Sequence, residues 1–275
     1  MITESFCSDP TAVINPEDIV SAVPGFPAVA VTCFSGVTFE RLCKELSAEP
    51  IREAVSGDAN GSIAVYRASW KGCDFALYLS RVGAAGCVGM LEDIFVFGAK
   101  AVVVFGTCGV LDGSIRDCGV ILPTSAVRDE GTSYHYAPAS ETIAVNVDTL
   151  SAAERVFNDL GVEYVKGKVW TTDGFYRETR TLVDLRKKED CIAVDMECSA
   201  LAAVAQFRKK RLLQFFYAAD NLDAETWDAR SLSNERNLFE KDRIAFLAME
   251  LASTLYETED CTDDRTGKNA CRQAL

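Results

Sequence analysis

Residues 192–201 read Ile192-Ala193-Val194-Asp195-Met196-Glu197-Cys198-Ser199-Ala200-Leu201, and in this stretch a short apolar run passes into a helix. If Cys191 to Val194 form a buried strand, both carboxylates follow its carboxyl end, where open α/β sheets bind their ligands. Asp195 suits the start of the helix, because its carboxylate can accept hydrogen bonds from the first free backbone N–H groups. The stretch therefore predicts an α/β fold with a ligand site beside this strand.

Glu197 needs a different explanation from Asp195. Helical spacing places it about 200 degrees around the axis from Asp195, so the two side chains cannot share one capping role. A carboxylate fixed in a cleft can accept two hydrogen bonds at once, which suits a pair of neighbouring sugar hydroxyls.

The composition narrows the class of protein. With 275 residues, 48% of them hydrophobic and 25% charged, the chain can bury one substantial core. The 41 acidic against 28 basic residues give a net charge of −13, which argues against nucleic acid or an anionic membrane as a partner. No stretch reaches the roughly 18 apolar residues of a membrane helix, and residues 1–12 do not resemble a signal peptide. We expect a cytoplasmic protein.

The 11 cysteines form an odd-numbered set without a CxxC pair, and they are scattered through the apparent strands and helices. This pattern is typical of small buried hydrophobes in a reducing compartment. It predicts neither a disulfide framework nor a metal site.

Strands and helices alternate along the chain. Ala28 to Phe34 is a predicted strand, Ser62 to Leu79 a hairpin, and Gly83 to Phe97 a helix followed by the uninterrupted apolar strand Lys100 to Phe105. An amphipathic helix, Asn234 to Tyr256, closes the pattern. We therefore expect one domain with a central mixed sheet over residues 25–256, an N-terminal extension over 1–24 and a polar, disordered tail over 257–275.

Three further strand ends combine glycine, polar or aromatic residues, namely Gly106-Thr107-Cys108-Gly109, Trp170 to Arg177 and Phe216 to Asn221. The glycines can bring backbone N–H groups close to a ligand, although glycine after a strand is also ordinary turn chemistry. Phe175 could stack on a planar base or belong to the core, and Asp220 could enter the site or cap the next segment. Three such ends together favour a ligand site.

The order of these motifs resembles the uridine phosphorylase and purine nucleoside phosphorylase family over roughly residues 25–256. The similar segments are Gly106 to Gly109, Asp129 to Pro138, Thr171 to Tyr176, Val194 to Glu197 and Asp220. The resemblance implies a three-layer α/β/α sandwich with a central mixed, partly barrel-like sheet. It also implies a homo-oligomer built from dimers, with hexamers common.

The resemblance also implies roles for single residues. Glu197 would bind the ribose 2′ and 3′ hydroxyls, Met196 would pack on the sugar, Thr107 would help to hold phosphate and ribose, and Asp220 would donate a proton to the base. Together with Glu197 and Asp220 as catalytic residues, the expected substrate-binding set is Thr107, Gly109, His135, Asp173, Phe175, Met196 and Glu197. Phosphate would attack the anomeric carbon and give ribose 1-phosphate, without a further cofactor or metal.

The phosphate site departs from the family pattern. The usual Gly-Asp-Pro turn and its arginine are replaced by Thr32 to Val37, and Val104-Phe105 stand where an arginine is expected. A phosphate dianion in an acidic protein needs compensating cations or several N–H donors. The candidate substitutes are Arg81, Arg128 and Arg177, each of which could instead be an internal ion-pair partner. The only histidine, His135, can donate to a hydroxyl or phosphate, or can simply be packed.

Three functions follow from these observations. The first is a nucleoside phosphorylase, the second a nucleosidase that uses water because the usual phosphate-binding arginines are missing, and the third a non-catalytic nucleoside-binding protein. Asp220 favours purines, whereas Asp129 to Pro138 is more similar to the uridine branch, so the base stays open.

Overall fold

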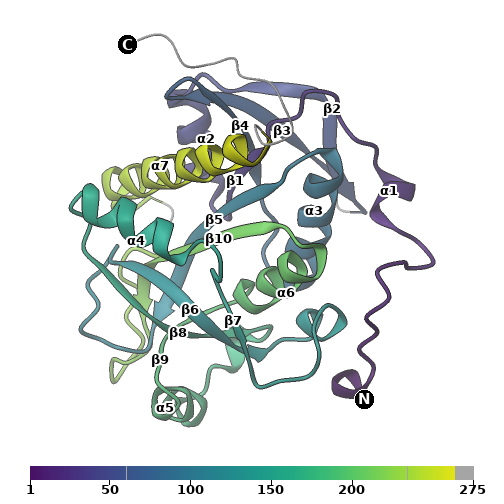
Figure 1. Ribbon diagram of the computed structural model, residues 1–275. Helices are drawn as coiled ribbons and strands as arrows, with labels where there is room; N and C mark the ends of the chain where they lie inside the picture. The colour runs from purple at the N-terminus through teal and green to yellow at the C-terminus, as the bar shows by residue number, and fades with distance from the viewer. Residues whose placement is uncertain (60, 234, 264–275) are drawn as a thin grey trace.

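A computed structural model describes residues 1–59, 61–233 and 235–263 of the chain (Figure 1). The strands are β1 Val29–Cys33, β2 Glu49–Asp58, β3 Gly61–Trp70, β4 Cys73–Leu79, β5 Ala101–Val110, β6 Val120–Asp129, β7 Thr142–Ala144, β8 Tyr164–Thr172, β9 Cys191–Asp195 and β10 Arg211–Asn221. The α-helices are α1 Pro16–Ile19, α2 Gly36–Glu45, α3 Ala84–Phe97, α4 Leu150–Asp159, α5 Arg180–Lys188, α6 Cys198–Arg208 and α7 Leu238–Asp263, and the 3-10 helices are η1 Ile2–Glu4, η2 Thr132–His135 and η3 Phe175–Arg177.

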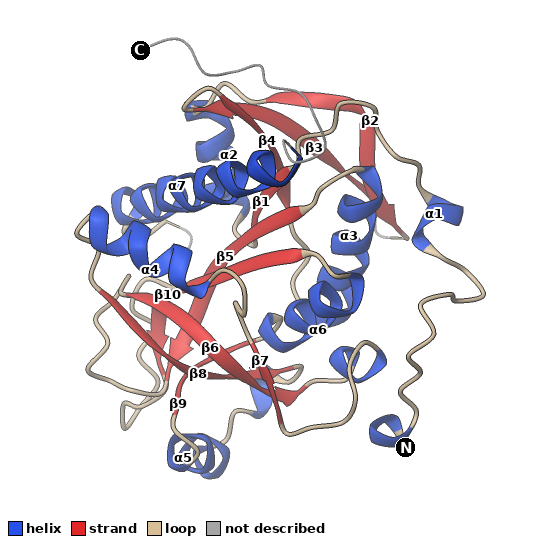
Figure 2. Ribbon diagram, viewed as in Figure 1, coloured by secondary structure: helices blue, strands red, loops and turns tan. Residues whose placement is uncertain are grey.

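All of these strands belong to one mixed sheet. Its order is β10-β6-β8-β9-β5-β1-β4-β3-β2, with β7 paired to β6. Strand β10 also pairs with β5, which closes β5, β9, β8, β6 and β10 into a small barrel. The strands β1, β4, β3 and β2 extend from β5 of this barrel as an open sheet (Figure 2). The predicted mixed, partly barrel-like sheet is confirmed.

Helices cover both faces of the sheet, as the doubly buried strands require. In β1, Val29, Val31 and Cys33 join one apolar cluster, which contains residues of α2, α4 and α7. Ala30 belongs to a second cluster, which contains residues of α3 and α6. The alternation along one strand therefore produces the three layers that the family resemblance implied.

The first residues of the chain lie outside this sandwich (Figure 1). Part of the N-terminal extension packs beside α3, where the Val23 N–H donates to the Phe97 carbonyl at 3.0 Å. Helix α7 continues to Asp263, so it covers the first residues of the expected tail, and 264–275 lie outside the described residues. In the part of the chain that the structure describes, no helix combines the length and the apolar character needed to span a bilayer.

Candidate functional site

The sheet register brings the selected strand ends together. Gly109 at the end of β5 pairs with Val194 of β9 on one side and with Asp220 of β10 on the other. Thr171 at the end of β8 pairs with Asp195 of β9. Strand ends that are far apart in the sequence thus converge around the last residues of β5, where Thr107 is partly exposed.

Asp195 is the last residue of β9, and its side chain caps the start of helix α6. Its Oδ2 accepts the backbone N–H groups of Glu197 and Cys198 at 2.8 and 2.6 Å, and its Oδ1 accepts the Thr171 hydroxyl at 2.8 Å. Burial raises the pKa of Asp195 to about 6, while these three donors lower it. The capping role predicted for Asp195 is confirmed.

Glu197 points away from that cap. Its Oε1 accepts the backbone N–H of Gly83 at 2.5 Å, and Gly83 has a φ of 92°, which glycine adopts without strain. Burial raises the pKa of Glu197 to about 8, and the negative charges of Asp195 and Asp173 raise it further. The backbone N–H of Gly83 and that of Met196 act in the opposite direction. Glu197 is thus a buried acid, and the neighbouring Met196 is partly exposed.

Asp220 is the second buried acid, with 9% of its surface exposed. Its Oδ2 accepts the indole N–H of Trp227 at 2.8 Å. A Cβ atom on Gly109 would lie 3.2 Å from Asp220 Oδ1 and 2.4 Å from Leu222 Cδ1, so only glycine lets β5 approach this closely. Burial raises the pKa of Asp220, whereas the Trp227 hydrogen bond and the charge of Arg230 lower it.

The segment that follows β8 carries aromatic and acidic residues. Phe175 and Tyr176 are exposed, with ring centroids 4.0 Å apart. Asp173 accepts the Gly131 N–H at 3.0 Å. Glu178 is partly buried, and burial together with the charge of Asp220 raises its pKa to about 7. The charge of Asp220, near the end of β10, therefore acts on Glu178, which lies just before α5.

The turn after β1 differs from a phosphate cradle. Cys33 pairs with Phe105 of β5, so the next residue, Phe34, lies beside Gly106. A Cβ atom on Gly106 would lie 2.8 Å from Cδ2 of the Phe34 ring, which shows that the ring packs on this glycine. The Ser35 hydroxyl accepts the Thr38 N–H at 3.3 Å and caps α2. An aromatic ring therefore covers Gly106 of β5, next to Thr107, for which the family resemblance implied a contact with phosphate.

Arg128 is buried and hydrogen bonded to the segment that follows β6. Its guanidinium donates to the Ser133 and Ser140 hydroxyls at 2.8 and 2.9 Å and to two backbone carbonyls, those of Ala137 and Pro138. It also lies 4.1 Å from the centre of the Tyr134 ring. Its N–H groups are thus engaged by the segment that follows β6.

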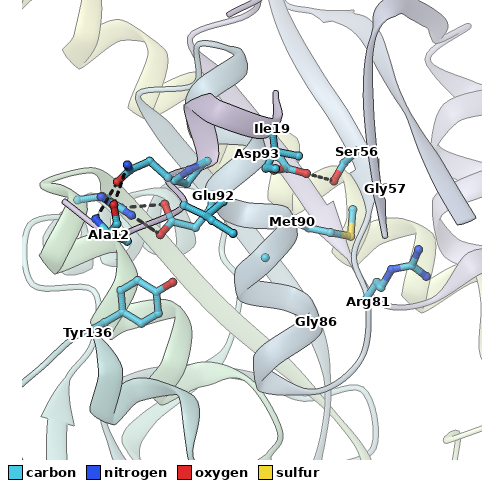
Figure 3. A pocket seen from close by; sticks show the side chains of 15 residues that line it. Ala12, Ile19, Ser56, Gly57, Arg81, Gly86, Met90, Glu92, Asp93 and Tyr136 are labelled. Atoms are coloured by element: carbon cyan, nitrogen blue, oxygen red, sulfur yellow. Dashed lines mark hydrogen bonds and ion pairs between the residues drawn. The ribbon is translucent and has the colours of Figure 1, made fainter. Parts of the chain in front are cut away.

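The other candidate phosphate ligands come from three separate segments of the chain. Arg81 donates to the Gly61 carbonyl at 2.6 Å and lines a cavity of about 420 Å³ between the N-terminal segment, β2 and α3 (Figure 3). Arg177 ends η3 and His135 ends η2, and both side chains are exposed. Among the described residues, no group of three or more His, Cys, Asp or Glu side chains could hold a metal ion.

Several residues of this arrangement were not selected from the sequence. Trp227, Glu178 and Gly83 contact or act on the two buried acids, and Phe34 covers Gly106. Phe34 follows β1 directly, and the pairing of Cys33 with Phe105 brings its ring beside Gly106. Trp227 lies seven residues beyond Asp220 in a segment without periodicity, and only the fold brings the two together.

The chain is similar to proteins of a known family. A family model described as "Phosphorylase superfamily" matches residues 28–252. A guanosine phosphorylase of Halorubrum lacusprofundi is 24% identical over 147 residues, which is 54% of this chain and 61% of that protein. A DeoD-type purine nucleoside phosphorylase of Bacillus cereus is 30% identical over 120 residues, 42% of this chain and 49% of that protein. The chain thus spans about three fifths or less of the length of these two relatives.

Solved structures share the fold. A uridine phosphorylase from Vibrio fischeri ES114 superimposes with a TM-score of 0.72 and 21% identity, covering 86% of this chain and 97% of that one. An AMP nucleosidase from Bacteroides thetaiotaomicron gives a TM-score of 0.67 and 18% identity, with 86% and 91% covered.

Proposed function

This chain belongs to the phosphorylase superfamily, and from that premise we propose that it is a nucleoside phosphorylase, which transfers the pentose of a nucleoside from its base to inorganic phosphate. The observation that carries the proposal is the pairing of Gly109 with both β9 and β10. This pairing sets the segment of Glu197 and the carboxyl of Asp220 on the two sides of the glycine-containing end of β5.

The proposed reaction needs two groups with different roles. Breaking an N-glycosidic bond builds positive charge on the sugar and negative charge on the departing base, so the site needs an anion at one end and a proton donor at the other. Glu197 would accept hydrogen bonds from the ribose 2′ and 3′ hydroxyls, and Met196 would pack on the sugar. Asp220 would have to carry a proton when the nucleoside binds, and burial, which raises its pKa, acts in that direction. Such acid catalysis contributes typically about 10²- to 10⁴-fold in rate.

The remaining assignments follow the same geometry. Thr107 and Gly109 would contact phosphate and ribose, and Phe175 and Asp173 would lie at the base. Asp220 supports a purine, as do the names of the relatives that act on guanosine or purine nucleosides. The partners would be the nucleoside and phosphate, without another cofactor. The family resemblance also supports a homo-oligomer built from dimers.

Hydrolysis is the second candidate, and the Phe34 ring on Gly106 favours it. Phosphate would need that ring to move, and neither Thr32 to Val37 nor Val104-Phe105 contains the arginine expected there. Water needs neither a cation nor the space of a phosphate group.

One assay separates the two reactions. Inosine, guanosine, adenosine and uridine are incubated with the protein, with and without phosphate, and free base, ribose and ribose 1-phosphate are measured. Phosphorolysis predicts base release only with phosphate, together with ribose 1-phosphate. Base release without phosphate, together with free ribose, would replace it by hydrolysis. Nucleoside binding without any release would leave a binding protein.

A further inference from the structure

Trp227 is a large exposed side chain that the proposed reaction leaves unused. It follows β10, and 61% of its surface is accessible. Its indole Nε1–H nevertheless donates to Asp220 Oδ2 at 2.8 Å. A water-exposed indole that is hydrogen bonded to a nearly buried carboxyl calls for a functional explanation.

The backbone around Trp227 holds it in this place. Asn221 and Asp228 form a short antiparallel bridge, with N–H to carbonyl distances of 2.8 and 3.3 Å in the two directions. Arg180 at the start of α5 donates to the carbonyls of Leu222 and Ala224 at 2.7 and 2.8 Å. The segment between Asn221 and Asp228 is therefore closed on itself and tied to α5, so the position of the indole is fixed by the fold.

Several charges act on Asp220, and its carboxyl accepts a hydrogen bond from the Trp227 side chain. Arg230 and Asp228 act on it from its own segment, and Glu178 acts from the turn before α5. The buried Cys108 thiol lies nearby on β5. Within residues 1–59, 61–233 and 235–263, Trp227 is the side chain that donates a hydrogen bond to the Asp220 carboxyl.

The two oxygens of Asp220 have different surroundings. Oδ2 is engaged by the indole, whereas Oδ1 faces the Gly109 end of β5, 3.2 Å from the position of a Cβ atom there. The proton that is passed to a substrate therefore belongs on Oδ1, on the side of Gly109 and the end of β5.

We propose that Trp227 is a positioning residue, which holds Asp220 through Oδ2 so that Oδ1 delivers its proton to the base, an inference that rests on the proposed function. When the C–N bond breaks, its electron pair moves to the base, and a base nitrogen takes the Oδ1 proton. The carboxylate that remains accepts the indole N–H. A hydrogen bond to a charged acceptor is stronger than one to a neutral acid, so the indole stabilises Asp220 as it loses its proton.

Trp227→Phe tests this role, because it keeps a ring and removes the N–H. We expect kcat to fall about threefold to tenfold, with a smaller change in KM. The alkaline limb of the pH–rate profile moves up by roughly one pH unit, because the group that favoured the charged form of Asp220 is gone. Trp70→Phe is the matched control, since Trp70 ends β3 and its ring packs against Phe246 of α7. An unmoved alkaline limb in Trp227→Phe overturns the inference.

A second measurement does not need turnover. The tryptophan fluorescence of the unaltered protein should show a pH-dependent step as Asp220 ionises next to Trp227, and this step should persist in Trp70→Phe. The part of the step that comes from Asp220 should disappear in both Trp227→Phe and Asp220→Asn, whereas a part from Trp170, whose indole donates to Asp129 Oδ2 at 2.9 Å, should persist in both. No base release by the unaltered protein would end the proposed function, whereas a step that is unchanged in Trp227→Phe would end this inference alone.

Discussion

At the scale of the single residue, Glu197 carries an energetic cost in the folded chain. Burial raises its pKa from 4.5 to about 8, so the folded state binds more protons than the unfolded state between these two values. The contribution of Glu197 to stability therefore falls as the pH rises from about 4.5 to 8. A buried acid that lowers the stability of the fold is expected at a binding site, where function outweighs stability.

Glu197→Gln tests this cost. We expect the free energy of unfolding at pH 8 to rise by an amount on the order of a few kcal/mol, since each pKa unit corresponds to about 1.36 kcal/mol. At pH 4, where the acid is neutral in both states, the gain should vanish. Chemical denaturation at the two pH values measures it. Equal stabilities of the variant and the unaltered protein at pH 8 would show that Glu197 is not a buried, strained acid.

Asp220→Asn addresses the other acid. The asparagine oxygen can still accept the Trp227 N–H, but the side chain has no acidic proton to give. We expect kcat on a purine nucleoside to fall about 10²- to 10⁴-fold, with KM changed less. Steady-state kinetics measure both constants, and circular dichroism confirms that the variant folds. Unchanged turnover would remove Asp220 from the reaction.

At the scale of the element, the start of α6 depends on Asp195. Its carboxylate satisfies two backbone N–H groups and the Thr171 hydroxyl in a buried setting. Asp195→Ala should lower the free energy of unfolding by about 2–4 kcal/mol, because buried donors lose their acceptor. Thr179→Ala is the matched control, since Thr179 caps the exposed start of α5 with a longer bond of 3.4 Å. Denaturant titration should show a much smaller loss there, and equal losses would contradict the capping account.

Elements differ in how far the sequence could predict them. The apolar run around Val103 predicts β5, because a strand buried on both faces needs apolar side chains at every position. Strand β6 was not predicted, since Pro123 interrupts its pattern and the register shifts between Pro123 and Ser125. Strand β2 was missed as well, because it pairs only at its β3 side and carries Pro50 and polar residues.

At the scale of the whole molecule, the fold converts predicted strand ends into one site. The sequence predicted that Thr107, Glu197 and Asp220 follow strand ends. In the structure β5 and β10 run on to Val110 and Asn221, so Thr107 and Asp220 lie in their last residues, and the closed barrel brings these strands together. The direction of a long side chain could not be predicted in the same way. Arg81 follows β4 near Gly83, but its guanidinium turns toward Gly61. Packing against distant residues, which one sequence does not display, decides such directions.

The most direct test of the account is a crystal structure of the protein with a bound nucleoside. We expect a Glu197 carboxylate oxygen within about 2.5–3.0 Å of each of the ribose 2′ and 3′ oxygens, Met196 against the sugar and Asp220 Oδ1 toward the base. A nucleoside bound elsewhere, or a pentose that contacts neither Met196 nor Glu197, would contradict the central claim.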